Sequence, residues 1–249
     1  MNPPIPPPVR FDRLTVRPHE AGPDGRLRPG SLFDYLQDAA AGHADQLGCG
    51  IAFLRRRRLL WVLSRIRLEI RRYPAIGETL ELETYPSGPD KLFATRQFTL
   101  RDADGETAAR ASSCWLLLDG ATFRPRKVLA TLELPLPANG DRIRHFTELD
   151  KLAAPDGTVD RVEHRVRHSH IDVNCHLNNA FYAAFIADTL GELTGDFRAP
   201  RELQVNFLHA GALGDRIACG GTLTEDGEFR IDGQSPDGQT RYFQSAGRI

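Results

Sequence analysis

The sequence predicts an α+β fold made of two similar copies, because the same order of elements occurs twice along the chain. In each copy one helical pattern is followed by several alternating strands, and such runs of strands pack as an antiparallel sheet against the helix. Three registers align the copies in the same order: shifts of 150 (Asp24 onto Asn174), 137 (Ile66 onto Leu203) and 133 (Asp104 onto Asp237). Registers that recur in order indicate a duplication.

The first register predicts one long helix in each copy. Its apolar positions follow the i, i+3, i+4, i+7 spacing of a single helix face. The matched pairs are Leu32 and Tyr182, Tyr35 and Phe185, Leu36 and Ile186, and Ala39 and Thr189.

The other two registers predict strands and turns after each helix. Alternating apolar residues in 66–70 match 203–207, and Gly-acid turns at 77–78 and 214–215 follow them. We expect first-copy strands over 59–71, 79–85, 92–101 and 107–119. An antiparallel sheet wrapped around one long helix is the hotdog architecture, so the prediction is a tandem, or double, hotdog.

The domain boundaries follow from this repeat. Residues 1–8 read as an extended proline-rich arm, 9–130 as the N-terminal hotdog domain and 161–249 as the C-terminal hotdog domain. Between them, residues 131–160 have a weaker strand pattern and several prolines, which is typical of a linker. We expect a short helix within it near 146–152.

Composition narrows the classes of function. The chain has 249 residues, with 32 Lys plus Arg against 33 Asp plus Glu, so its charge does not predict binding to nucleic acid or to a membrane surface. Its four cysteines are far apart, and the first residues lack the apolar core of a signal peptide. We therefore expect a cytoplasmic location. No phosphate-binding glycine loop or close metal-ligand set occurs, so we expect no cofactor and no metal.

Chemically reactive side chains concentrate in the second copy. Asp172, Asn174 and His176 alternate, so they share one face if the chain is extended. Asn178 and Asn179 lie where a helix begins, and a helix N-terminus offers free N–H groups to a developing negative charge. At the corresponding places the first copy has Gly22, Asp24, Arg26, Arg28 and Pro29. This difference predicts one active site, carried by the second copy.

These residues resemble the signature of the acyl-ACP thioesterase family, the tandem-hotdog enzymes of plants and bacteria that release fatty acids from acyl carrier protein. The segment 172–179, Asp-Val-Asn-Cys-His-Leu-Asn-Asn, followed by Tyr182, is similar to the D-x-N-x-H-x-N-N-x-x-Y pattern of that family. Further resemblances in the first copy are Leu-Gln-Asp-Ala-Ala at 36–40, Trp-Val-Leu-Ser-Arg at 61–65, Arg-Tyr-Pro at 72–74, Gly-Glu at 77–78 and Ser-Cys-Trp at 113–115.

The resemblance implies hydrolysis of the thioester of acyl-ACP and a role for each motif residue. Such a reaction needs a water, a base and donors for the carbonyl oxygen. His176 is the natural base, since the ordinary pKa of an imidazole, about 6.5, is near working pH. By resemblance, Asn174 orients the water or the carbonyl and Asp172 positions or tunes its neighbours. Backbone N–H groups near Asn178 and Asn179 are the candidate oxyanion donors.

One position departs from the family pattern. The family usually carries an acidic residue, sometimes followed by Cys, four positions before the second-copy Gly-Asp turn, and this chain has Ala210 there. Three explanations stay open. The three motif residues suffice with water, or His209 substitutes because it alternates to the face of Phe207, or catalysis is weak.

Structural interpretations compete with several of these roles. Asn178 and Asn179 are good helix caps, Asp172 suits an Asx turn, and Cys175 reads as a packing residue rather than a nucleophile. Tyr182, Phe185 and Ile186 read as core that also lines an acyl pocket. Residues Arg55, Arg56, Arg57 and Arg58 form either a solvated loop or a docking site for the acidic carrier protein.

Three rival functions follow from the same site. One is an acyl-CoA thioesterase, a second is a non-catalytic acyl-binding protein, which Ala210 makes credible, and a third is a hydratase or dehydratase on a hotdog fold. The expected partner is acyl carrier protein, and a homodimer is compatible with the duplication.

Overall fold

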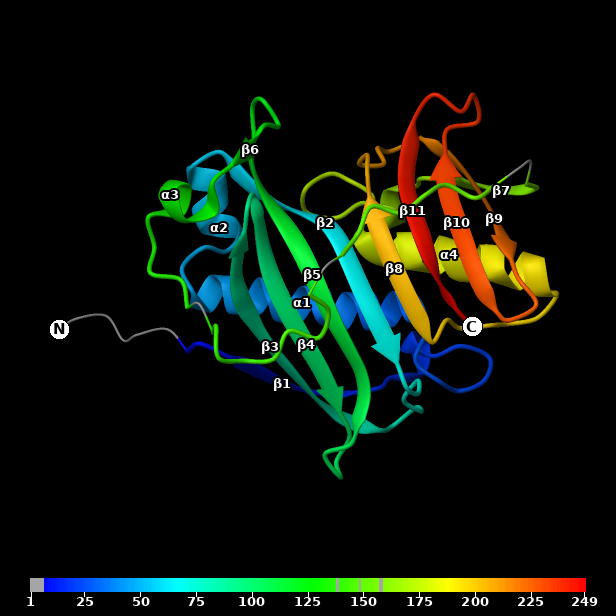
Figure 1. Cartoon of the computed structure of the whole chain (residues 1–249), viewed down its shortest axis with the longest axis horizontal. Coiled ribbons are helices and arrows are strands. Elements are labelled where there is room, and N and C mark those ends of the chain that lie inside the picture. The colour runs from blue at the N-terminus through cyan, green and yellow to red at the C-terminus, as the bar shows by residue number, and fades with distance from the viewer. Residues whose placement is uncertain (1–6, 138, 148, 157–158) are drawn as a thin grey trace.

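The computed structural model describes residues 7–137, 139–147, 149–156 and 159–249. The strands of both copies form one antiparallel sheet, and two long helices lie on one of its faces (Figure 1). Most of the proline-rich arm, residues 1–6, lies outside the described residues. The carbonyl of Pro7 accepts a hydrogen bond of 3.0 Å from Nε2 of His43.

The first copy contributes six strands to the sheet. Its elements are β1 (Arg10–Thr15), a 3₁₀ turn η1 (Pro18–Glu20), α1 (Pro29–Gln46), α2 (Ile51–Arg56), β2 (Leu59–Ile70), β3 (Thr79–Asp90), β4 (Phe93–Arg101), β5 (Thr107–Asp119), β6 (Pro125–Arg126) and α3 (Val128–Leu132). The four strands predicted from the sequence are confirmed, and β3 runs five residues further than expected, to Asp90 rather than 85.

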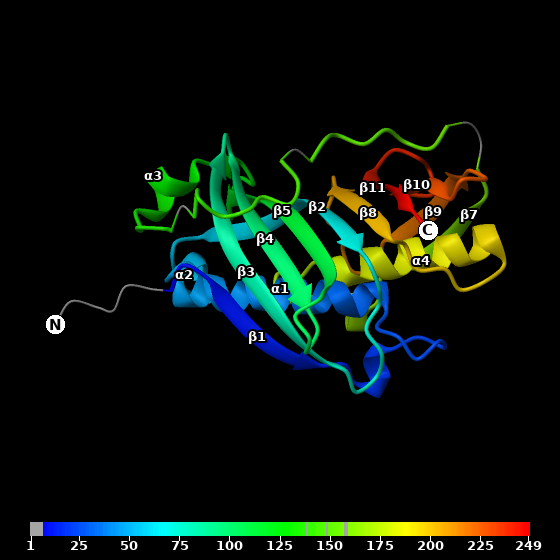
Figure 2. The ribbon, with the colours of Figure 1, turned by 60° about the horizontal axis from the view of Figure 1, so that its bottom comes forward.

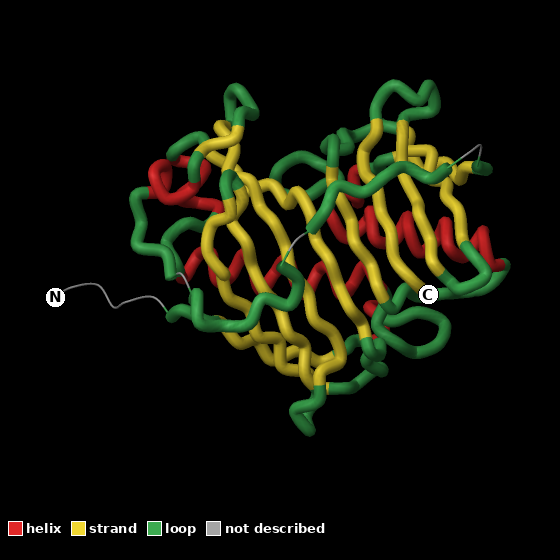
Figure 3. Tube along the Cα trace, in the orientation of Figure 1, coloured by secondary structure: helices red, strands yellow, loops and turns green. Residues whose placement is uncertain are grey.

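The second copy repeats this order with shorter connections. Its elements are β7 (Arg161–Arg165), η2 (His168–His170), α4 (Asn179–Thr194), β8 (Glu202–Phe207), β9 (Arg216–Leu223), β10 (Glu228–Gln234) and β11 (Arg241–Arg248). The strand order is β1-β3-β4-β5-β2-β8-β11-β10-β9-β7, with β6 paired to β5. Figure 3 shows the yellow strands of the two halves continuing into one another.

The copies join through equivalent strands, β2 and β8. Ile66 pairs with Val205, and Leu68 pairs with Leu203. Because the shift of 137 makes Ile66 equivalent to Leu203, this exchange of partners is what a two-fold axis between the copies produces. The axis passes through the Arg67–Gln204 pair, so the chain is built as a pseudo-dimer.

Backbone geometry agrees with the duplication at the registers of 150 and 137. The bridges Ala21–Leu27 and Ile171–Leu177 are separated by the shift of 150 and close corresponding turns before the two helices. At the shift of 137, Gly77 and Gly214 have φ of 81° and 93°, a left-handed conformation that costs glycine little. The tandem hotdog fold is therefore confirmed.

The helix faces predicted from periodicity are the buried ones. All eight matched positions of α1 and α4 are buried, and all but Thr189 belong to one apolar cluster that runs through both copies. The helices also touch each other near their N-termini (Figure 1). A Cβ placed on Gly30 would lie 3.1 Å from the carbonyl oxygen of Ala180, so glycine permits this close approach.

The linker differs from the prediction. A short helix was expected near 146–152, but the described residues of that segment contain no helix. Residues 143–147 and 149–154, here named the strap, instead cross the sheet on the face opposite the helices (Figure 2).

Hydrogen bonds to the sheet explain why the strap is not helical. The N–H of Phe146 donates to Oγ of Ser112 at 3.1 Å. The carbonyl of Asp150 accepts from the amides of Gln204 and Asn206 at 2.8 and 2.9 Å. Coiling this segment into a helix would move these backbone groups away from Ser112, Gln204 and Asn206, and the buried polar side chains would then lose their partners.

Candidate active site

The residues between η2 and α4 form a tight turn, not an extended strand. We name residues 171–177 the motif turn. Oδ1 of Asp172 accepts the backbone N–H groups of Asn174 at 2.8 Å and His176 at 3.2 Å, and the N–H of Asp172 donates to the carbonyl of His176 at 2.8 Å. The expected strand with three side chains on one face is therefore wrong, because the Asp172 carboxylate folds the backbone back onto itself.

Cys175 takes the most constrained position of the motif turn. Its φ is 63°, and the equivalent Gly25 of the first copy has φ of 71°. A side chain in this left-handed region meets the backbone, which costs about 1–2 kcal/mol. Cys175 is also exposed, so the expectation that it packs in the interior is wrong.

His176 and Asn174 differ in exposure. The Asn174 side chain is exposed, whereas His176 is half-buried beside buried Leu177. The turn that carries them contacts the first copy, since Nη2 of Arg55 donates to the carbonyl of Val173 at 2.8 Å. The motif turn therefore contacts the first copy through its backbone, and the Asn174 side chain is open to water.

Helix α4 begins directly after the motif turn. Oδ1 of Asn178 accepts the N–H of Ala180 at 3.0 Å, which confirms Asn178 as the N-cap. Asn179 is the first helical residue. The N–H of Ala180 is taken by this cap, and the N–H groups of Asn178 and Phe181 donate to the carbonyls of His170 and Asn178. The oxyanion role predicted for this helix start therefore stays a prediction for the N–H of Asn179.

The first copy contributes polar side chains at this point that sequence reasoning missed. Nε2 of Gln37 donates to Oδ1 of Asn178 at 2.9 Å and to Oδ1 of Asp34 at 2.8 Å. Gln37 belongs to the Leu-Gln-Asp-Ala-Ala segment that resembles the family pattern. That resemblance was the available signal, but nothing local in the sequence connected Gln37 with residue 178.

Tyr182 lies in the core and fastens the loop after β8. It is 2% exposed, its hydroxyl accepts the N–H of Gly211 at 3.0 Å, and its ring packs edge-on against Phe207 and Phe243. Burial raises the pKa of Tyr182 well above its ordinary value. Phe185 and Ile186 are equally buried, so these side chains fill core space in the present conformation.

His209 has a different environment from the one expected. Strand β8 ends at Phe207, so alternation along the strand does not extend to His209. The N–H groups of Leu208 and His209 both donate to the carbonyl of Tyr242, and the His209 ring packs edge-on against the Tyr242 ring at 5.9 Å. The geometric reason given for His209 as a substitute acid is therefore wrong. Ala210 is exposed in the same loop.

The arginine run has mixed roles. Its first residues end α2 rather than forming a loop. Arg55 holds the motif turn, and Arg57 stacks on the Phe53 ring at 4.7 Å and lies 3.9 Å from Glu133. All four arginines are exposed.

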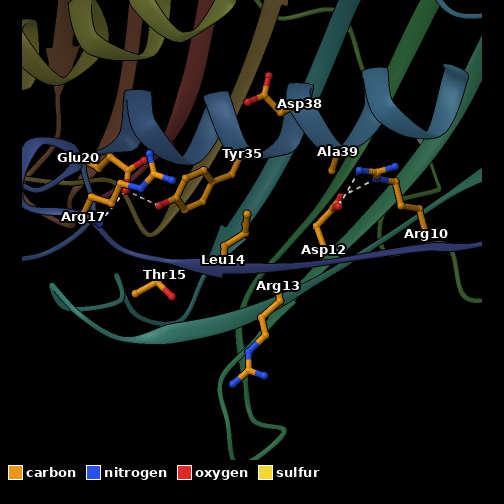
Figure 4. Close-up of a pocket in the computed structure, with 10 residues that line it drawn as sticks. All are labelled: Arg10, Asp12, Arg13, Leu14, Thr15, Arg17, Glu20, Tyr35, Asp38 and Ala39. Carbon is orange, nitrogen blue, oxygen red and sulfur yellow. Dashed lines mark hydrogen bonds and ion pairs between the residues drawn. The ribbon is translucent and has the colours of Figure 1, made fainter.

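A polar groove of about 420 Å³ lies between β1 and α1 (Figure 4). Arg10 pairs with Asp12 at 2.7 Å, and the Tyr35 hydroxyl donates to Oε2 of Glu20 at 2.6 Å. Figure 4 shows Arg13 directed away from α1. With this charged lining, the groove does not suit an acyl chain.

A narrow apolar gap lies beneath α1, where the helix packs on the sheet. Its lining is Leu32, Leu36, Leu68, Phe98, Leu100, Ala109, Arg110 and Ala111, and it is too small to admit a water molecule. An acyl chain would therefore need side chains around α1 to move. The gap lies beneath the helix that contacts the motif helix.

The fold and this site define a tandem hotdog protein whose polar motif occurs in the second copy only. Comparison with known proteins then identifies the family of the chain. The family model for the acyl-ACP thioesterase N-terminal domain matches residues 10–133, and that for the acyl-ACP thioesterase C-terminal domain matches residues 154–242. The chain belongs to the acyl-ACP thioesterase family.

Individual relatives agree with this placement. The chain is 31% identical over 194 residues to the chloroplastic palmitoyl-acyl carrier protein thioesterase of Arabidopsis thaliana, covering 71% of this chain and 46% of that protein. It is 27% identical over 214 residues to oleoyl-acyl carrier protein thioesterase 1 of the same plant, covering 79% and 58%. The chain thus spans about half the length of the curated relatives it matches.

Solved structures support the fold. An acyl-ACP thioesterase from Bacteroides thetaiotaomicron superposes with a TM-score of 0.84 at 22% identity, covering 96% of this chain and 97% of that one. The 12:0-ACP thioesterase from Umbellularia californica gives 0.78 at 22% identity, covering 96% and 93%. At this identity the likeness concerns the fold. No helix in the described part of the chain is long and apolar enough to cross a membrane.

Proposed function

We propose that this protein is an acyl-ACP thioesterase, which hydrolyses the thioester of fatty acyl carrier protein to free fatty acid and the carrier thiol. One observation carries the proposal: both family models match in order, and the matching motif folds as a turn directly before the N-terminus of α4. The reaction would then take place where the motif turn meets the first copy.

The roles proposed for the motif follow from its geometry. His176 removes a proton from water as the water attacks the thioester carbonyl, and the same proton then goes to the departing thiolate. Asn174, exposed on the turn, orients the water or the carbonyl. The N–H of Asn179, at the start of α4, stabilises the oxyanion. Asp172 acts through the backbone, because its carboxylate holds the N–H groups of both Asn174 and His176.

The acyl chain is proposed to bind beneath α1. The apolar gap between α1 and strands β2, β4 and β5 would have to open, because it is too small to admit a water molecule in this conformation, and α1 contacts α4 beside the motif. Tyr182, Phe185 and Ile186 would line this path only after a rearrangement, since they are packed in the core.

The carrier protein is proposed to dock beside α2. Arg55 connects α2 to the motif turn, and exposed Arg56 and Arg58 would meet the acidic surface of the carrier and its phosphate. A cytoplasmic location, which the four free cysteines support, and a homodimer of such chains belong to the same proposal.

Hydrolysis assays on a panel of acyl-ACPs from short to long chains test the function directly. Wild type should release free acid and carrier thiol. His176→Ala should lower kcat by about 100-fold or more, the scale of losing general base catalysis. Asn174→Ala should lower kcat without unfolding the protein, because its side chain is exposed.

The rival functions give different products in the same experiment. A higher kcat/KM with acyl-CoA than with acyl-ACP would favour an acyl-CoA thioesterase. Equal thiol release by wild type and His176→Ala would favour a non-catalytic acyl-binding protein, which the alanine at position 210 makes a specific rival. Enoyl or hydroxyacyl thioester without free acid would favour a hydratase or dehydratase.

A further inference from the structure

The pseudo-two-fold axis creates two related places where the N-terminus of one long helix meets the side of the other. Gly30 and Ala180 are equivalent in the register of 150, and they lie against each other. At one place Asn178 of α4 meets Gln37 of α1. At the related place the equivalents of these two residues are Arg28 and Ala187.

The two places differ in the side chains that the side of the long helix presents there. Asp34 and Gln37 of α1 correspond to Ala184 and Ala187 of α4. The alanines have no hydrogen-bonding side chain, and the first copy also lacks the motif residues. The amide and carboxylate of α1 therefore occur together with the motif of α4, although they belong to the other copy.

The hydrogen bonds at this place have a defined direction. Oδ1 of Asn178 accepts the N–H of Ala180 at 3.0 Å, so the atom facing Gln37 must be an oxygen. Gln37 must then donate, and its second N–H goes to Oδ1 of Asp34 at 2.8 Å. A chain of hydrogen bonds leads from Asp34 through Gln37 to Asn178 and the first turn of α4.

The Asp34 carboxyl is held in partly buried surroundings. Burial raises its pKa above the ordinary value, and hydrogen bonds from Gln37 and Asn178 lower it in part. A half-buried carboxylate orders the donors around it more strongly than a neutral acceptor does. This ordering fixes the Gln37 amide toward α4.

We infer that Gln37, held by Asp34, is a positioning residue of the proposed thioesterase site, contributed by the copy that does not carry the motif. The inference rests on the proposed function. Gln37 fixes the Asn178 cap and with it the direction of the first-turn N–H groups of α4. It also connects α1, beneath which the acyl chain is proposed to bind, to the helix that receives the oxyanion.

Steady-state kinetics on Gln37 variants with the acyl-ACP that wild type prefers test this role. Gln37→Glu keeps the side-chain shape but removes both donors, and Gln37→Leu removes all polarity. Both should lower kcat by about 10- to 100-fold, the cost of misplacing catalytic groups by up to an ångström. KM should change less than about threefold, because the acyl-binding surface is intact. Asp34→Asn should show a smaller loss of kcat.

A matched control separates positioning from stability. Gln46→Leu makes the same change on the same helix at an exposed place, and its kcat should equal that of wild type. Thermal unfolding of every variant is measured alongside. The inference is overturned if both Gln37 variants keep kcat within about twofold of wild type, or if their loss disappears at a temperature well below unfolding.

The same measurements distinguish a failure of the positioning role from a failure of the proposed function. An active wild type, an inactive His176→Ala and unimpaired Gln37 variants would refute the positioning role and leave the thioesterase standing. A wild type that releases no thiol from any acyl-ACP would refute the function, and the positioning role with it.

Discussion

Gly30 of α1 and Ala180 of α4 are equivalent residues that lie against each other across the pseudo-two-fold axis, with 3.1 Å between a Cβ built on Gly30 and the Ala180 carbonyl oxygen. The two helices can approach this closely because one of the pair is glycine. The site depends on that approach, since it brings Gln37 within hydrogen-bonding distance of Asn178.

Gly30→Val should push the helices apart. Two added methyl groups have no room beside the carbonyl, and overpacking of this kind costs about 1–3 kcal/mol. The free energy of unfolding in urea should fall by that amount, and kcat should fall with it. Gly140→Val is the control, because a Cβ at Gly140 meets nothing within 4 Å. Equal stability of the two variants would contradict this account of the contact.

The backbone of Cys175 predicts a stabilising substitution. Its φ of 63° is a conformation that glycine adopts without strain. Cys175→Gly should raise the free energy of unfolding by about 0.5–1 kcal/mol, less than the full strain because glycine gains entropy in the unfolded chain. The reciprocal change, Gly25→Ala, should destabilise, although a Cβ there has open space. Denaturant unfolding gives the free energy of unfolding of both variants. If Cys175→Gly is less stable than wild type, the cysteine side chain stabilises the fold by more than its backbone strain costs.

Tyr182→Phe should loosen the loop after β8. The Gly211 N–H is buried and donates to the Tyr182 hydroxyl, so removing that oxygen leaves a buried donor without its partner, at a cost of about 1–3 kcal/mol. Amide hydrogen exchange at Gly211 should become faster, whereas amides in the middle of β11 should exchange as before at matched stability. Unchanged exchange at Gly211 would mean that the hydroxyl is not its partner in solution.

Stability should fall between about pH 6.5 and pH 4 because of His43. The side chain is 0% exposed, and burial, together with the charges of Arg96 and Arg10, lowers its pKa to about 4. Above pH 6.5 the imidazole is neutral in both states and adds no pH dependence. Below it, the unfolded chain takes up a proton that the folded chain does not, so stability decreases until the folded pKa is reached.

Urea unfolding across this pH range checks the assignment. Changing the buried imidazole to an amide, His43→Gln, should reduce the slope of unfolding free energy against pH by nearly one proton. His168→Gln, which changes an exposed histidine, should leave the slope as in wild type. If the two variants have the same slope, His43 is not the group responsible.

Local patterns in the sequence were enough to predict the repeat, the helix faces and most strands. Periodicity identified Leu36 and Ile186 as equivalent buried positions, and both are buried. The equivalent turns of the two copies were predictable for the same reason. Glycine at positions such as 77 and 214 is a local requirement of the backbone. Such signals depend on neighbours a few residues apart.

The sequence by itself therefore determined that this protein is a duplicated hotdog with its motif in the second copy. Only the tertiary structure decided how that motif is used. The carboxylate of Asp172 closes a turn, the described residues of 146–152 are not helical because the sheet supplies their partners, and His209 packs beside Tyr242. Gln37 reaches Asn178 across 141 positions of chain. Hydrogen bonds between distant segments form only after the sheet and helices have brought them together, and no local pattern encodes such a contact.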